Sequence, residues 1–159
     1  MSERAEVEAA LLECYAWTRS LALMLARNGF EADDLVQEAF ARALRSPPQT
    51  VNAAAVRAWL RTTMVRDLIR NRGRAARELK AFGRLFLQPP PVPATTQAGD
   101  DLQRALRRLP PRQRAVIVLR YVHDLPEDEI AEALGVAAGT VKAHLAQARQ
   151  KLRGIIGED

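Results

Sequence analysis

Cysteine and histidine are scarce in this chain, which holds one cysteine, Cys14, and two histidines, His123 and His144. A single cysteine cannot form an internal disulfide or supply a pair of zinc ligands. No cysteine or carboxylate stands at ligand spacing from the histidines, so we expect no metal site and no cofactor. Leucines and aromatic residues surround Cys14, with no cation beside it, which favours an inert core position over a reactive thiol.

Long hydrophobic runs are also missing, since no apolar stretch approaches the roughly 18 to 20 residues of a membrane-spanning helix. The first eight residues lack the basic start and apolar run of a signal peptide. We therefore expect a soluble, cytoplasmic protein without membrane insertion. The sequence also lacks Gly-x-Ser-x-Gly, a phosphate-binding glycine loop and His-Glu-x-x-His. It offers no catalytic residue, and we expect neither an enzyme nor a small-molecule substrate.

Lysine is rare, whereas arginine is abundant. The chain holds 24 basic and 19 acidic residues, a net charge of +5, and only Lys80, Lys142 and Lys151 among the basic residues are lysines. Residues 57–84 hold nine basic and two acidic side chains, a net charge of +7 that exceeds that of the whole chain. The arginine fork suits phosphates and base edges, and clustering of positive charge on one segment favours nucleic-acid binding over a merely solvated face.

A proline-rich segment divides the chain into two parts. Four prolines lie within residues 89–93, where they exclude a helix and favour a semi-rigid extended linker. We assign residues 88–101 to this linker, which at about 3.1 Å per residue could span roughly 43 Å. The predicted domains are therefore residues 1–87 and 102–159, held apart by the linker.

Apolar residues recur at helical spacing in both parts, while strand signals are weak. The sequence therefore predicts an all-α protein with two small helical domains. Asn28-Gly29 should end the first helix, Asp33 and Asp34 should open the second, and Ser46-Pro47-Pro48 should end it, with Gly73 a candidate interruption of the third. The expected helices cover residues 5–27, 33–45, 53–72 and 75–87 in the first domain, and 102–108, 111–122, 126–134 and 139–153 in the second.

The last two expected helices have the pattern of a helix-turn-helix. Ile130, Ala131 and Leu134 share one helix face, and Gly135 suits the left-handed turn that follows. The outward face of the second helix carries donors, acceptors and cations suited to a major groove: Thr140, Lys142, Ala143, His144, Gln147, Gln150 and Lys151. The alternative is a plain helical hairpin with a solvated face, which the lack of acids between Glu132 and Glu158 disfavours.

Residues 109–122, 129–135 and 139–153 closely resemble region 4 of the sigma-70 superfamily. With one further domain only, the chain is similar to the small extracytoplasmic-function (group IV) sigma factors. This resemblance implies that residues 102–159 read the minus-35 element of a promoter. The implied contacts are Thr140, Lys142, Ala143, His144, Gln147 and Lys151.

Residues 32–44 look like the region 2.2 helix that docks on the clamp coiled coil of RNA polymerase. The resemblance implies polymerase contacts by Asp33, Asp34, Gln37, Glu38 and Arg42, although a solvated acidic helix start would have the same composition. Residues 57–74 look like regions 2.3 and 2.4, which melt and read the minus-10 element. Phosphate contacts would then come from Arg61, Arg66, Arg70, Arg72, Arg74 and Arg77.

Three further features concern the minus-10 assignment. Family members often carry Asn and Asp where Arg66 and Arg70 align, so these two residues depart from the family pattern and the resemblance does not set the minus-10 base specificity. The loop 45–55 lies where family members capture an unstacked base, and Gln49, Thr50 and Asn52 can bond a base edge. Trp59 could stack on a base, but Val56, Leu60 and Thr63 share its face and favour a core role.

The resemblance implies a sigma factor that binds the clamp coiled coil and flap of core RNA polymerase, promoter DNA and an anti-sigma factor. Two other functions fit the motifs. A helix-turn-helix DNA-binding regulator would bind duplex DNA without polymerase, at a palindromic site. A non-initiating, sigma-like interaction protein would bind polymerase or another sigma factor without starting transcription.

Overall fold

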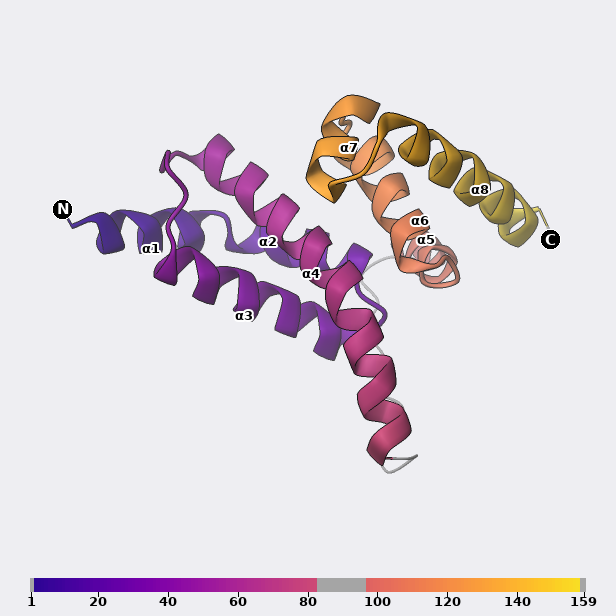
Figure 1. The fold of residues 1–159 in the computed structure, drawn as a ribbon, viewed down its shortest axis with the longest axis horizontal. Helices are drawn as coiled ribbons and strands as arrows, with labels where there is room; N and C mark the ends of the chain where they lie inside the picture. Colours follow the sequence, from indigo (N-terminus) through magenta and orange to yellow (C-terminus); the bar gives the residue numbers. More distant parts are fainter. Residues whose placement is uncertain (1, 83–96, 158–159) are drawn as a thin grey trace.

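The computed structural model describes residues 2–82 and 97–157, with the backbone alone for residues 71–82 and 97–100, and every element in this part of the chain is helical (Figure 1). This confirms the predicted all-α class. The first domain contains α1 (Glu3–Glu13), α2 (Tyr15–Leu25), α3 (Gly29–Arg45) and α4 (Ala53–Phe82). The second contains α5 (Gln97–Arg107), α6 (Pro111–Ile117), the π-helical turn η2 (Val118–Val122), α7 (Glu127–Leu134) and α8 (Ala138–Ile156). No helix in the described ranges is both long and apolar enough to span a membrane.

The N-terminal helix is divided at Cys14, where a single helix over 5–27 was expected. Cys14 is fully buried and lies between α1 and α2. The Thr18 hydroxyl donates a hydrogen bond of 2.7 Å to the Cys14 carbonyl oxygen. Side-chain bonds of this type compete with the helical ladder and bend helices. The bend turns α2 towards α3 and α4, so the buried cysteine has the structural place that its neighbours predicted.

The second helix begins earlier than expected, because Asn28 starts a helix instead of ending one. Its side-chain oxygen accepts a hydrogen bond of 2.9 Å from the Glu31 amide, and α3 therefore begins at Gly29 rather than at Asp33. The predicted end of this helix at Ser46-Pro47-Pro48 is confirmed. The expected interruption at Gly73 is wrong, because α4 continues through it to Phe82.

The second domain is built around α8, which packs against α6 and α7. Pro111 occupies the first turn of α6, and Gly135 ends α7 with a φ of 70°, as the sequence predicts. The helix expected over 111–122 changes to π-helical geometry at Val118, an irregularity that periodicity does not encode. The helix expected from 102 begins at Gln97, inside the segment assigned to the linker.

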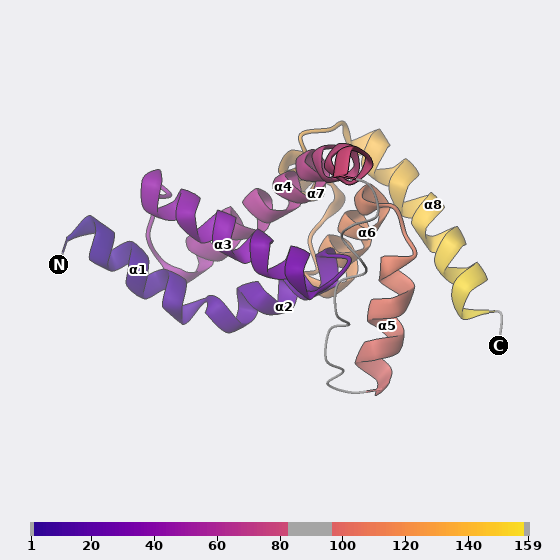
Figure 2. The ribbon, with the colours of Figure 1, turned by 90° about the horizontal axis from the view of Figure 1, so that it is seen from below.

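The two domains pack directly on one another, although we expected the linker to hold them apart. Helix α4 contacts α6 and α7, and α2 contacts α5 and α6 (Figure 2). Buried residues of both domains form one continuous core. Arg114 on α6 crosses the junction and donates a hydrogen bond of 2.5 Å to the Leu25 carbonyl oxygen at the end of α2. The prolines at 89–93 lie outside the described residues.

Candidate nucleic-acid interface

Helix α8 presents two distinct faces. Val141, Leu145 and Ala148 are buried against the rest of the helix-turn-helix, as their spacing predicts. The opposite face is open to solvent, with Thr140 half-buried at its start. The exposed residues of that face include Lys142, Ala143, Gln147, Gln150 and Lys151. This face carries cations and amides and no acid, and its one contact among the described hydrogen bonds is that from Gln113 of α6 to the Gln147 side-chain oxygen, at 3.4 Å.

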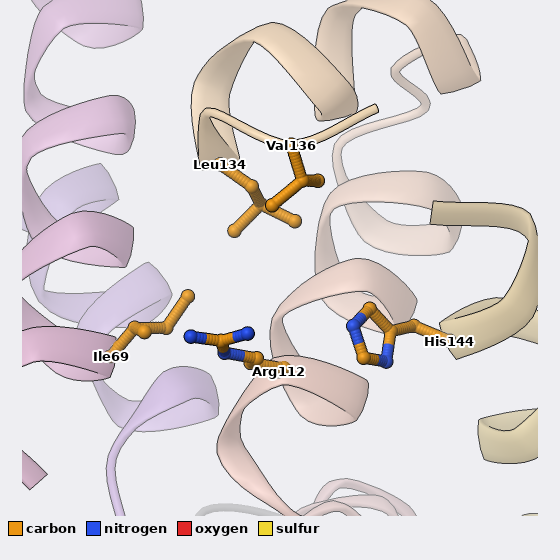
Figure 3. Close-up of a pocket in the computed structure, with 5 residues that line it drawn as sticks. All are labelled: Ile69, Arg112, Leu134, Val136 and His144. Atoms are coloured by element: carbon orange, nitrogen blue, oxygen red, sulfur yellow. The ribbon is translucent and has the colours of Figure 1, made fainter. Parts of the chain in front are cut away.

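His144 points elsewhere. Its half-buried ring lies in a pocket of about 40 Å³ between the two domains, lined also by Ile69, Arg112, Leu134 and Val136 (Figure 3). Its Nδ1 atom is buried and makes no hydrogen bond within the described residues. In this arrangement His144 lines the pocket between the domains, whereas Lys142 and Gln147 are exposed.

The predicted minus-10 arginines on α4 lie in different environments. Arg61 is half-buried, and burial lowers the pKa of its guanidinium. Arg66 donates from Nε to the Ala133 carbonyl oxygen at 2.9 Å and from Nη2 to the Glu132 carbonyl oxygen at 3.1 Å. Arg70 is exposed one turn further along α4. The remaining predicted contacts, Arg72, Arg74 and Arg77, have side chains outside the described residues.

The loop between α3 and α4 exposes the three candidates for base capture. Gln49 and Thr50 are exposed. Asn52 is exposed too, but its side-chain oxygen accepts a hydrogen bond of 2.9 Å from the Ala55 amide and so caps α4. Trp59 is partly buried against the core, the position that its helical neighbours favoured.

The predicted polymerase helix, α3, combines free and internally paired side chains. Asp34 and Gln37 are exposed, whereas Asp33 forms an ion pair of 2.5 Å with Arg19 of α2. Hydrogen bonding to Asp33 raises the pKa of Arg19. Glu38 lies 3.2 Å from Arg42 and 3.4 Å from Arg45. The acidic face of α3 is thus held in place by arginines on the same domain.

Arg42 also reaches a residue that sequence reasoning missed. Its Nη1 atom lies 3.0 Å from Oδ1 of Asp67, a fully buried carboxylate on α4. Burial raises the pKa of Asp67, and the charges of Arg42 and Arg70 oppose that effect. Asp67 follows the buried Leu60 by seven residues and Met64 by three, so helical periodicity contains the signal that could have located it.

Arg114 is a second residue whose contacts the sequence did not reveal. The residue is almost fully buried, and its guanidinium donates to the carbonyl oxygens of Leu106, Leu109 and Leu25. Two of these acceptors end α5 and its following turn, and the third ends α2. Arg114 therefore joins the two domains through backbone groups that no side-chain motif records.

Comparison with known proteins places both domains in one family. Residues 11–78 match the model "Sigma-70 region 2" and residues 99–152 match "Sigma-70, region 4". The RNA polymerase sigma-E factor of Streptomyces coelicolor is 34% identical over 149 residues, which cover 89% of this chain and 83% of that protein. The chain belongs to the sigma-70 family. Its relatives place it among the extracytoplasmic-function (ECF) sigma factors.

Other relatives of this ECF sigma factor agree. SigE of Mycolicibacterium smegmatis is 35% identical over 146 residues, and the chain spans 56% of that protein's length. SigM of Mycobacterium tuberculosis is 33% identical over 137 residues and 70% of its length. A solved structure of the Bartonella quintana sigma factor RpoE, in complex with the anti-sigma factor NepR, shares the fold with a TM-score of 0.76. That match has 24% identity and covers 96% of this chain and 97% of that one.

Proposed function

We propose that this sigma factor directs promoter-specific transcription initiation by joining core RNA polymerase to promoter DNA. The observation that carries the proposal is the solvent-exposed face of α8, where Lys142 and Gln147 stand on a helix whose other side is buried in a helix-turn-helix. A helix presented in this way fits the duplex major groove. Residues 102–159 would read the minus-35 element through Thr140, Lys142, Ala143, Gln147 and Lys151, with His144 joining them only if it leaves the interdomain pocket.

Residues 1–87 would serve the minus-10 element and the polymerase. The arginines of α4 supply phosphate contacts, and Gln49 and Thr50 in the loop before it supply donors and acceptors for a base. Melting would follow from differential binding, because these groups contact a strand that is available only when the duplex is open. The exposed Asp34 and Gln37 on α3 would bind the clamp coiled coil, and the second domain would bind the flap.

Two further parts of the proposal follow from the family. The protein would work in the cytoplasm, where polymerase acts, and would catalyse no reaction itself. An anti-sigma factor would regulate it, since the Bartonella quintana RpoE of the same fold was crystallised with NepR. The proline-containing segment that joins the two domains would let them engage separate promoter elements.

In vitro transcription tests the proposal. The purified chain is added to core polymerase with promoter fragments from the source genome, and open complexes and run-off transcripts are measured. Transcripts should depend on both the sigma factor and a promoter. Tight core binding without an open complex on any fragment would instead indicate a non-initiating interaction protein. Tight binding to a palindromic duplex without polymerase would indicate a helix-turn-helix regulator.

A further inference from the structure

The part of α4 that carries Arg61 and Arg66 is covered by another part of the same chain. Helix α7, the first helix of the helix-turn-helix, lies against α4 (Figure 1). Four of the eight residues of α7 are acidic, namely Glu127, Asp128, Glu129 and Glu132. A short acidic helix therefore lies where the proposed function requires a strand of DNA.

Arg66 makes the most specific contact of this junction. Its two hydrogen bonds go to the carbonyl oxygens of Glu132 and Ala133, which belong to the last turn of α7. Carbonyl groups in the last turn of a helix have no partner within the helix and carry the negative end of its dipole. The arginine fork binds two carbonyl oxygens of this turn at once, of which that of Glu132 also accepts a hydrogen bond of 3.2 Å from the Gly135 amide. The Nε and Nη2 edge of the fork cannot bind a phosphate in bidentate geometry while it is held there.

Arg61 lies near the other end of α7. The charge of Glu129 acts on its guanidinium, and its Nη1 atom lies 3.5 Å from the His123 ring, just before α7. Arg61 and Arg66 thus meet the acidic start and the carbonyl end of α7, respectively.

The interface between the two domains is incompletely packed beside these contacts. The pocket between the domains has Ile69 of α4 on one side and Leu134, Val136 and His144 on the other (Figure 3). The buried Nδ1 atom of His144 has no hydrogen-bond partner among the described residues. A buried polar atom without a partner raises the free energy of the packed state. At this part of the interface, polar contacts such as those of Arg66 therefore hold the domains together more than close packing does.

We propose that α7 covers the minus-10 face of α4 at Arg61 and Arg66 within the same molecule. The two hydrogen bonds of Arg66 to α7, which we call the latch, hold the chain in this closed state. The inference rests on the proposed function for the role of the covered face, but the contact itself does not. The chain must open at the α4–α7 junction before Arg61 and Arg66 can contact DNA. Opening would expose the minus-10 face and would also free the helix-turn-helix to move to its own element.

Distance measurements on the full chain, without DNA or polymerase, test the latch. Spin labels are placed on Glu13→Cys in α1 and Gln150→Cys in α8, both exposed, while the fully buried Cys14 is shielded from the reagent. Double electron–electron resonance then gives the populations of closed and open chains. Arg66→Ala should raise the open-to-closed ratio by about threefold to tenfold, as expected for loss of two partly exposed charge-assisted hydrogen bonds. Arg66→Lys should lie between the two.

Arg70→Ala is the matched control, because it removes the same charge from the same helix one turn away, at an exposed residue that forms no hydrogen bond or ion pair with α7 among the described residues. It should leave the distances unchanged, and circular dichroism should show equal helicity for all variants. An unchanged distance distribution for Arg66→Ala would overturn the latch. Failure of in vitro transcription would leave this result intact, so the two proposals fail separately.

Discussion

The two proposed DNA surfaces of this sigma factor differ in what covers them. The recognition face of α8 is open, and its lysines and glutamines meet solvent. The arginine face of α4 is partly covered by α7, which binds Arg66 through backbone carbonyls, while Arg70 stays exposed. The second domain thus exposes its own proposed DNA surface on α8, while its helix α7 covers part of the proposed DNA surface of the first domain. A regulator that opened or stabilised this junction would control access to the α4 surface.

The largest expected effect comes from breaking the buried contact that holds the two domains in their relative positions. Arg114→Ala removes three hydrogen bonds and leaves the carbonyl oxygens of Leu106, Leu109 and Leu25 without this donor. We expect the free energy of unfolding to fall by about 3 kcal/mol, because buried groups left unpaired are costly. Urea denaturation followed by circular dichroism measures the change.

The exposed Arg108 gives the control for this prediction. Arg108→Ala removes the same charge from the neighbouring turn and should change the unfolding free energy by less than about 0.5 kcal/mol. Equal destabilisation by the two variants would show that general charge, and not the buried contact, stabilises the domain junction. If Arg114→Ala separates the domains without unfolding them, the urea transition should become biphasic.

A smaller effect should distinguish the exposed face of α8 from the covered face of α4. Lys142→Ala and Gln147→Ala remove side chains from the exposed face of α8. Each should weaken minus-35 recognition in the holoenzyme about tenfold, which is a typical loss for one base or phosphate contact. Binding to core polymerase should stay the same. Equal losses of promoter and core binding would contradict the assignment of this face, and neither variant should change the interdomain distances.

The difference between the two surfaces also explains which parts of the fold and of the candidate site could be predicted from the sequence. Val141, Leu145 and Ala148 define the inward face of α8 by local spacing, so its outward face follows from the same turn of helix. Ala133, which accepts a hydrogen bond from Arg66, lies 67 positions away in the sequence. Leu25, which accepts one from Arg114, lies 89 positions away. Those contacts depend on how two domains dock, which no helical period encodes. The bend at Cys14 likewise depends on a side-chain bond from Thr18 to the backbone, which propensity alone does not reveal.

The smallest expected effect is a pH dependence of the closed state, centred on His123. Its ring packs against Trp17 of α2 at 5.1 Å between centroids, and its Nδ1 atom lies 3.5 Å from Nη1 of Arg61. Burial, and then the charge of Arg61, lowers the pKa of His123 below 6.5. The other charged groups around it are Arg57 over Trp17, Glu129 beside Arg61, and Arg120 and Asp124 on its own segment.

Because its pKa is lowered in the closed state, His123 binds its proton more readily once the domains separate. The closed state therefore keeps its full stability above the ordinary pKa of 6.5 and loses part of it as the pH falls below that value. Between pH 7.5 and 5.5, the open population in the spin-label experiment should rise. His123→Gln, which cannot take up a proton, should remove this rise while Arg70→Ala retains it. An identical pH response in His123→Gln would place the titrating group elsewhere in the junction.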